Sequence, residues 1–200
     1  MAKIRLTKNE LKKQKDSLKM YRRYLPTLIL KKQQLQSEIR ITELRIKDLK
    51  AEKEQLDESF KSWVAVFGEK GIFTPGILKI TSVKTSHGNI AGVAIPVFEK
   101  AEFEIFPYNF IHTPLWLDTA VEKMKQAILL DLEAMIVEEQ RKRLARELKT
   151  TTQRVNLFEK VMIPRTRDNI KKIQVYLGDQ QTAAVVRGKI AKSGLVKAAK

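Results

Sequence analysis

Residues that could carry out catalysis are few in this 200-residue chain, and their spacing matches no catalytic motif. The two histidines, His87 and His112, have no ligand or nucleophile partner at motif spacing, and the chain contains no cysteine. Gly188-Lys189 is followed by Ile190, and Ala183 stands where a phosphate-binding loop needs its first glycine, so this is not a P-loop. We therefore predict no catalytic residue, no cofactor site and no metal site.

Charged residues of one sign gather instead in two separate parts of the chain. Residues 1–32 carry a net charge of +9 and residues 141–200 carry +12, whereas residues 33–63 carry −1 and residues 64–140 carry −4. Surfaces this basic attract acidic proteins or nucleic acid. Because few aromatic side chains are interleaved with the cations, we do not expect nucleic acid as the partner.

The elements that position these charges are indicated by a heptad repeat of apolar residues. The repeat runs over residues 11–67, returns over residues 115–177, and predicts a mainly α fold built on a long antiparallel two-helix coiled coil. Thr7 is a suitable N-cap for the first helix, and we expect this helix to stay continuous, with a kink, through Pro26. Facing residues should have numbers that sum to about 182, which places Ile39 near Leu144 and Leu148.

Between the two helices, residues 68–114 predict a small β-insert. Alternating β-branched residues run toward and away from His87-Gly88-Asn89, which predicts a β-hairpin with its turn at the Gly-Asn pair. After Gly178 the heptad periodicity is lost, so the predicted division is residues 1–67, 68–114, 115–177 and a basic tail at 178–200. The first part of the second helix is apolar on more than one side, and Leu130 and Val137 are expected to be covered by the insert or by another protein.

The chain is expected to be cytoplasmic. Its first residues lack the apolar core of a signal peptide, and no apolar run reaches the roughly eighteen residues that a membrane span requires.

Two short segments resemble the D subunit of the V-type and archaeal-type rotary ATPases. Arg154-Val155-Asn156-Leu157-Phe158-Glu159, followed by Met162-Ile163-Pro164, is similar to the RVN-x-LE run and IP pair of that family. Asn89-Ile90-Ala91-Gly92-Val93-Ala94-Ile95-Pro96 is similar to its N-x-x-GV-x-x-P stretch. Residues 24–35 depart from the family's usual basic run and look like a bacterial variant.

The resemblance implies a non-catalytic central rotor stalk. It would turn inside a ring of catalytic A and regulatory B subunits, bind the small F subunit and the socket subunit of the membrane rotor, and lie at the membrane only through the complex. Leu130 and Val137 would then contact the F subunit or the insert. The residues expected to face acidic loops in the bore of the ring are the cations Lys12, Lys13, Arg22, Arg23, Arg165, Arg167, Lys171 and Lys172.

Two other classes of protein are alternatives. A prefoldin-like chaperone also places β-hairpins between coiled-coil helices, but such chains are shorter and expose apolar rather than basic helix tips. A nucleic-acid-binding coiled coil would account for the charge, but not for the β-insert or the RVN run.

Overall fold

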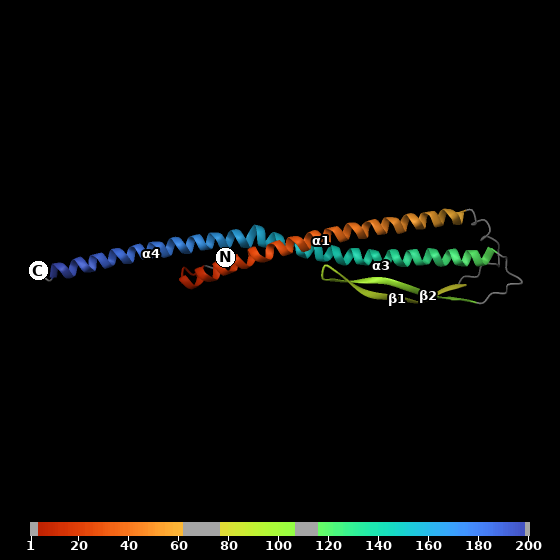
Figure 1. Cartoon of the computed structure of the whole chain (residues 1–200), viewed down its shortest axis with the longest axis horizontal. Coiled ribbons are helices and arrows are strands. Elements are labelled where there is room, and N and C mark those ends of the chain that lie inside the picture. Colours follow the sequence, from red (N-terminus) through yellow and green to blue (C-terminus); the bar gives the residue numbers. More distant parts are fainter. Residues whose placement is uncertain (1–3, 62–76, 107–115, 199–200) are drawn as a thin grey trace. The chain divides into compact units, whose positions relative to one another are not determined.

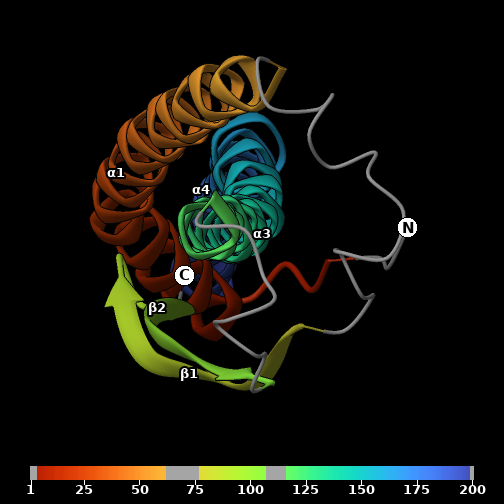
Figure 2. The same ribbon diagram turned by 90° about the vertical axis from the view of Figure 1, so that its right-hand side faces the viewer.

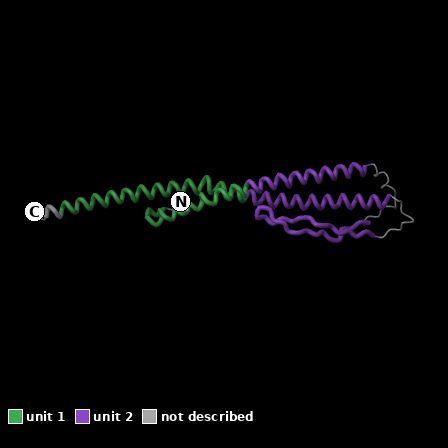
Figure 3. The backbone as a smooth tube through the Cα atoms, viewed as in Figure 1, with its two compact units in different colours: residues 1–32, 150–200 green, residues 33–149 purple. Residues whose placement is uncertain are grey.

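A computed structural model describes residues 4–61, 77–106 and 116–198, with side chains up to residue 194. The chain divides into two compact units, residues 1–32 with 150–200 (unit 1) and residues 33–149 (unit 2) (Figure 3). The predicted end of the first helix at Phe67, the predicted start of the second near Leu115, and His112 lie outside the described residues.

The first helix, α1 (Lys8–Lys61), begins where the sequence predicts. The Thr7 hydroxyl accepts a hydrogen bond from the backbone N–H of Glu10 at 3.2 Å, which satisfies one of the N–H groups that a helix start leaves without a partner. Pro26 lies inside α1, and the helix is continuous through it. One residue later, the Thr27 hydroxyl donates to the backbone carbonyl of Tyr24 at 2.8 Å.

In unit 2, α1 pairs with the helix α3 (Trp116–Asn156) at the predicted register. Leu35 and Leu144 are fully buried in one apolar cluster, against which Ile39 and Leu148 pack. Two ion pairs join the helices beside this seam, Arg45 to Glu133 at 2.7 Å and Lys53 to Asp131 at 2.6 Å. The prediction of two long helices with a β-hairpin between them is confirmed.

The hairpin consists of β1 (Leu78–Ile90) and β2 (Val93–Ile105), paired antiparallel with two irregularities in register. Its turn is Ala91-Gly92, so the predicted turn at Gly88-Asn89 is wrong. Both turn residues have positive φ, 51° at Ala91 and 79° at Gly92, as a type I′ turn requires. The Asn89 side chain stabilises the turn by accepting a hydrogen bond from the Gly92 N–H at 2.9 Å.

The hairpin packs along α3 within unit 2 (Figures 1 and 2). Ile95 of β2 is 3% exposed and belongs to the same cluster as Leu35 and Leu144. Side chains of α3 also bind the outer edge of β2, because Gln140 donates to the Pro96 carbonyl at 2.6 Å and Arg143 to the Ala94 carbonyl at 3.4 Å. At the other end of the hairpin, a second cluster contains Ile77, Leu117 and Val121.

In unit 1, α3 continues into a six-residue π-helix (Leu157–Met162, here the π segment) and then α4 (Ile163–Ala198). The Ile163 N–H bonds to the Phe158 carbonyl, five residues back. Pro164 follows, and its ring has no N–H and crowds the carbonyl four residues back in a regular helix.

The second helical stretch is longer than predicted. It extends to Ala198, so its expected end at Leu177 is wrong. A glycine inside a helix costs only about 1 kcal/mol relative to alanine, and the residues around Gly188 and Gly194 are mostly good helix formers.

Unit 1 is held together by antiparallel contact of α1 with the π segment and α4. The rings of Tyr21 and Phe158 lie 5.2 Å apart, and the Asn169 amide donates to Gln14 at 3.4 Å. The numbers in both pairs fit the predicted register.

Candidate partner-contact surfaces

The eight cations predicted to contact a partner lie on α1 and α4 of unit 1, and all of them are exposed. They are Lys12, Lys13, Arg22, Arg23, Arg165, Arg167, Lys171 and Lys172. Because no other part of the chain that the structure describes covers these side chains, they are available to acidic groups of another molecule.

Two of these cations, Lys13 and Arg165, line a groove of about 510 Å³ between α1 and α4. Arg5 adds a third cation and Glu10 a carboxylate. The remaining lining is a mixture of amide, hydroxyl and apolar side chains: Ile4, Gln14, Ser17, Tyr21, Met162, Thr166 and Asn169. The excess of positive charge makes the groove suited to an acidic segment.

A second groove, of about 600 Å³, lies further along α4 and is more apolar. Leu6, Val175 and Tyr176 form its apolar part, and the charged side chains at its edges are Asp168, Lys171, Lys172 and Asp179. Lys171 and Lys172 therefore border apolar surface as well as solvent.

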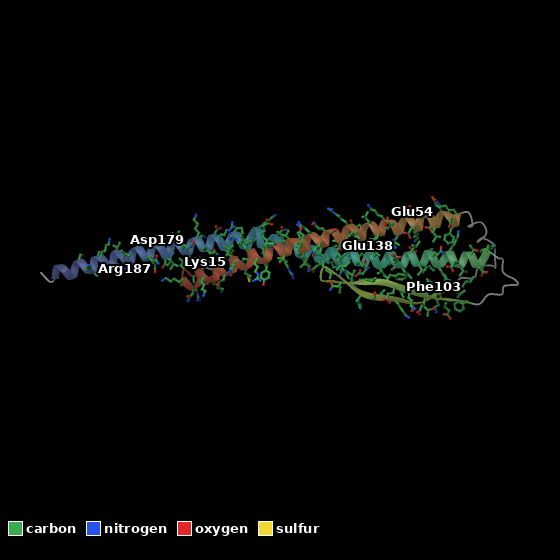
Figure 4. The ribbon with its side chains drawn as sticks, in the orientation of Figure 1. Lys15, Glu54, Phe103, Glu138, Asp179 and Arg187 are labelled. Atoms are coloured by element: carbon green, nitrogen blue, oxygen red, sulfur yellow. The ribbon has the colours of Figure 1, made fainter. Side chains whose placement is uncertain are left out.

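Beyond this groove, every described side chain from residue 178 to residue 194 is exposed. Apolar residues are included, since Val185, Val186 and Ile190 are between 48% and 64% exposed. Arg187, labelled in Figure 4, lies on the same stretch of α4. This part of the helix is amphiphilic surface with no cover from the described residues of unit 1.

The two apolar residues predicted to contact the F subunit or the insert differ in exposure. Val137 is only 8% exposed and lies seven residues before Leu144, on the helix stripe that faces the core of unit 2. Leu130 is half-buried. For Val137, burial within the chain favours packing inside unit 2 over a separate partner.

On the hairpin, three side chains surround the carboxylate of Glu102. Lys84 lies 2.8 Å from it and Lys100 3.1 Å, and the Ser82 hydroxyl donates to it at 2.9 Å. Hydrogen bonds from Lys84, then Ser82 and Lys100, lower the pKa of Glu102 to about 2. The strands also expose Ile80, Val83 and Ile105, while Phe103, labelled in Figure 4, is half-buried.

Other pKa shifts come from ion pairs on the helices. Hydrogen bonds to Glu133 and Asp131 raise the pKa values of Arg45 and Lys53, and Arg141 and Arg143 lower those of Glu138 and Glu139. Each shift favours the charged form, so these groups act as fixed charges at neutral pH.

The described residues hold no group of three or more histidine, cysteine, aspartate or glutamate side chains placed to bind a metal ion. Within the same residues, none of the helices combines the length and apolar character needed to span a membrane. The surfaces found are suited to binding proteins through charge and apolar contact.

Sequence reasoning missed one surface in unit 1. Met20, Tyr24, Leu157 and Val161 are large apolar side chains between 46% and 52% exposed. Leu157 and Val161 belong to the π segment, whose position the heptad pattern in the sequence does not indicate.

The sequence is similar to those of known proteins over almost its full length. The profile of a family described as the D subunit of ATP synthase matches residues 10–193. The chain is 55% identical to the V-type ATP synthase D subunit of Borreliella burgdorferi over 197 residues, covering 98% of this chain and 97% of that one. It is 32% identical to the protein of the same name from Chlamydia muridarum over 192 residues, covering 94% of each chain.

Proposed function

The chain belongs to the family of ATP synthase D subunits, and from this premise we propose that it is the central stalk of a rotary ATPase. It would transmit torque between the ring of A and B subunits and the membrane rotor, and would bind the F subunit and the socket subunit. In this role it carries out no chemistry, and it lies on the cytoplasmic side of the membrane only through the complex.

The observation that carries the proposal is the exposed end of α4. Seventeen consecutive residues, 178–194, are helical and exposed, and they include Val185, Val186 and Ile190. A single helix with little side-chain packing is marginally stable in water. A surrounding ring of subunits would cover these side chains and stabilise the helix, as an axle inside a bearing would require.

The eight exposed cations support an electrostatic contact with that ring. An exposed ion pair contributes about 1 kcal/mol or less and is screened by salt over roughly 8 to 10 Å. Such contacts can form and break as the axle turns, because no single one holds an orientation strongly. We propose that Lys12, Lys13, Arg22, Arg23, Arg165, Arg167, Lys171 and Lys172 act together in this way on acidic loops of the bore.

Isolation of the chain from its native membranes tests the proposal. With an affinity tag placed on an exposed residue, the expected co-purifying proteins are nucleotide-hydrolysing subunits, present in a fixed ratio together with ATPase activity. Recovery of unfolded client proteins or of nucleic acid in place of these subunits would contradict it.

A further inference from the structure

The π segment holds one residue more than a regular helix would hold at the same place. The buried side chains along this part of the chain include Thr151, Val155, Ile163, Thr166 and Ile173. Their spacing fits a heptad except between Val155 and Ile163, which are eight residues apart where a heptad repeat has seven. The wider π turn absorbs this extra residue, so the residues on both sides face inward.

It follows that the pairing of α1 with α4 does not depend on the extra residue. Removal of one exposed residue from the π segment, such as Glu159, would leave a regular heptad with the same residues facing inward. Short π-helices within α-helices occur frequently at functional sites. The side chains that the π segment presents to solvent are therefore candidates for a contact with another molecule.

By helical spacing, the exposed apolar side chains of the π segment, Leu157 and Val161, lie on the same flank of unit 1 as the 510 Å³ groove between α1 and α4. Ser17 of α1 lines this groove, and Met20 and Tyr24 follow it at helical spacings of three and seven residues. Arg165 of α4 lines the groove as well, and Val161 and Leu157 precede it at intervals of four residues. We call Met20, Tyr24, Leu157 and Val161 the π flank.

Cations border the π flank along both helices. Lys13 and Arg165 lie toward the groove, and Arg154 lies one turn before Leu157; all three are exposed. We propose that the π flank is a docking site for a segment of another protein in which an apolar side chain is flanked by carboxylates. The apolar side chain would contact Leu157 and Val161, and the carboxylates would face Lys13, Arg154 and Arg165.

This inference rests on the proposed function, since the acidic partner would belong to the same complex. It differs from that function in one respect. In the proposed function no single one of the eight cations is essential, whereas the apolar contact proposed here depends on particular side chains and is sensitive to the replacement of one of them.

Photocross-linking in the purified complex tests the site. A benzophenone amino acid replaces Leu157 in one variant and, as the control, Leu30 in another, because Leu30 is also in unit 1 and is 56% exposed. At position 157 we expect a cross-link to a peptide from a different protein of the complex, carrying an apolar residue beside aspartate or glutamate. Absence of that cross-link from an intact complex, equal yield at position 30, or a cross-linked peptide without carboxylates would overturn the proposal.

Failure of the wild-type chain to co-purify with ATPase subunits is a different result, because it contradicts the proposed function itself and the docking site with it.

A pair of single-residue deletions tests the part played by the π segment. Both Glu159 and Lys149 are exposed, but Lys149 lies in the regular helix α3. Deleting Glu159 should leave the Tm of the isolated chain within about 4 °C of wild type. Deleting Lys149 should lower the Tm by about 5 °C or more, because the apolar residues after the deletion would no longer face the partner helix.

In the complex, deletion of Glu159 should also reduce the cross-link from position 157, since it removes one residue between Leu157 and Val161. Equal losses of Tm in the two deletion variants, or an unchanged cross-link, would contradict the assigned role.

Discussion

The ionisation of a single residue, Glu102, makes the stability of the hairpin depend on pH. Its folded pKa of about 2 is below its value of about 4.5 in the unfolded chain, chiefly because Lys84 donates to it. Between these values the unfolded state binds more protons. The contribution of Glu102 to stability is therefore complete above about pH 4.5 and is lost as the pH falls to about 2.

An NMR titration of the Glu102 carboxyl measures this directly and should give a midpoint well below that of an unperturbed glutamate. The variant Lys84→Met serves as the comparison, and in it the midpoint should move upward. A wild-type midpoint near 4.5 would contradict the hydrogen-bonded arrangement described for Lys84, Ser82 and Lys100.

Among the elements, the hairpin turn is the place where a substitution should stabilise the chain. Ala91 has a φ of 51°, a left-handed conformation that costs a residue with a Cβ roughly 1 to 2 kcal/mol and that asparagine adopts more readily. Ala91→Asn should therefore raise the free energy of unfolding by about 0.5 to 1 kcal/mol in urea denaturation. Ala94→Asn, in the adjacent strand, is the control and should bring no gain; equal effects would contradict the turn geometry.

Pairing between α1 and α3 can be tested with introduced cysteines, because the chain has none of its own. Ile39→Cys with Leu144→Cys should form a disulfide on mild oxidation, since both residues belong to the same buried cluster. Ile41→Cys with Leu144→Cys should not, because Ile41 is 56% exposed and on another face of the helix. Cross-linking of the second pair in preference to the first would rule out the register.

The elements also show which structural features the sequence could predict. A heptad repeat indicated the existence, orientation and register of the long helices, because burial of Leu35, Leu144 and similar residues dominates their packing. The hairpin turn was misplaced because alanine is a weak signal for positive φ, whereas Gly-Asn is a strong one. The exact position of the π segment depends on how the apolar residues before it and after it both pack against α1. The local sequence preferences of the segment do not encode that packing.

The candidate contact residues were predictable to different degrees for similar reasons. Clustered charge is visible in sequence and is seldom buried, so the exposure of the eight cations followed from their type. The surroundings of Val137 depend on where the hairpin packs, and the exposure of Leu157 and Val161 depends on the π segment. Both are properties of tertiary packing.

For the whole molecule, the distributed charge of unit 1 should matter collectively in the complex. Replacement of Arg165 alone by glutamine should change ATP turnover little, because one exposed ion pair contributes about 1 kcal/mol or less. Replacement of Arg22, Arg165, Arg167 and Lys171 together should slow or uncouple the motor, and raised salt should slow the wild type.

The control for this set is replacement of four exposed lysines of unit 2, Lys47, Lys50, Lys79 and Lys142, which should have a smaller effect. Full coupled activity of the unit 1 variant would mean that the shape of the axle transmits torque without the help of its charge.

Observation of rotation in single complexes tests the central claim, that this chain is the axle. A probe would be attached to a cysteine introduced at exposed Glu104 of β2, with the ring of A and B subunits fixed to a surface. With ATP present, the probe should turn continuously in one direction, and its rotation should stop when ATP is removed. A probe that stays fixed relative to the ring while the complex hydrolyses ATP would show that the chain is not the axle.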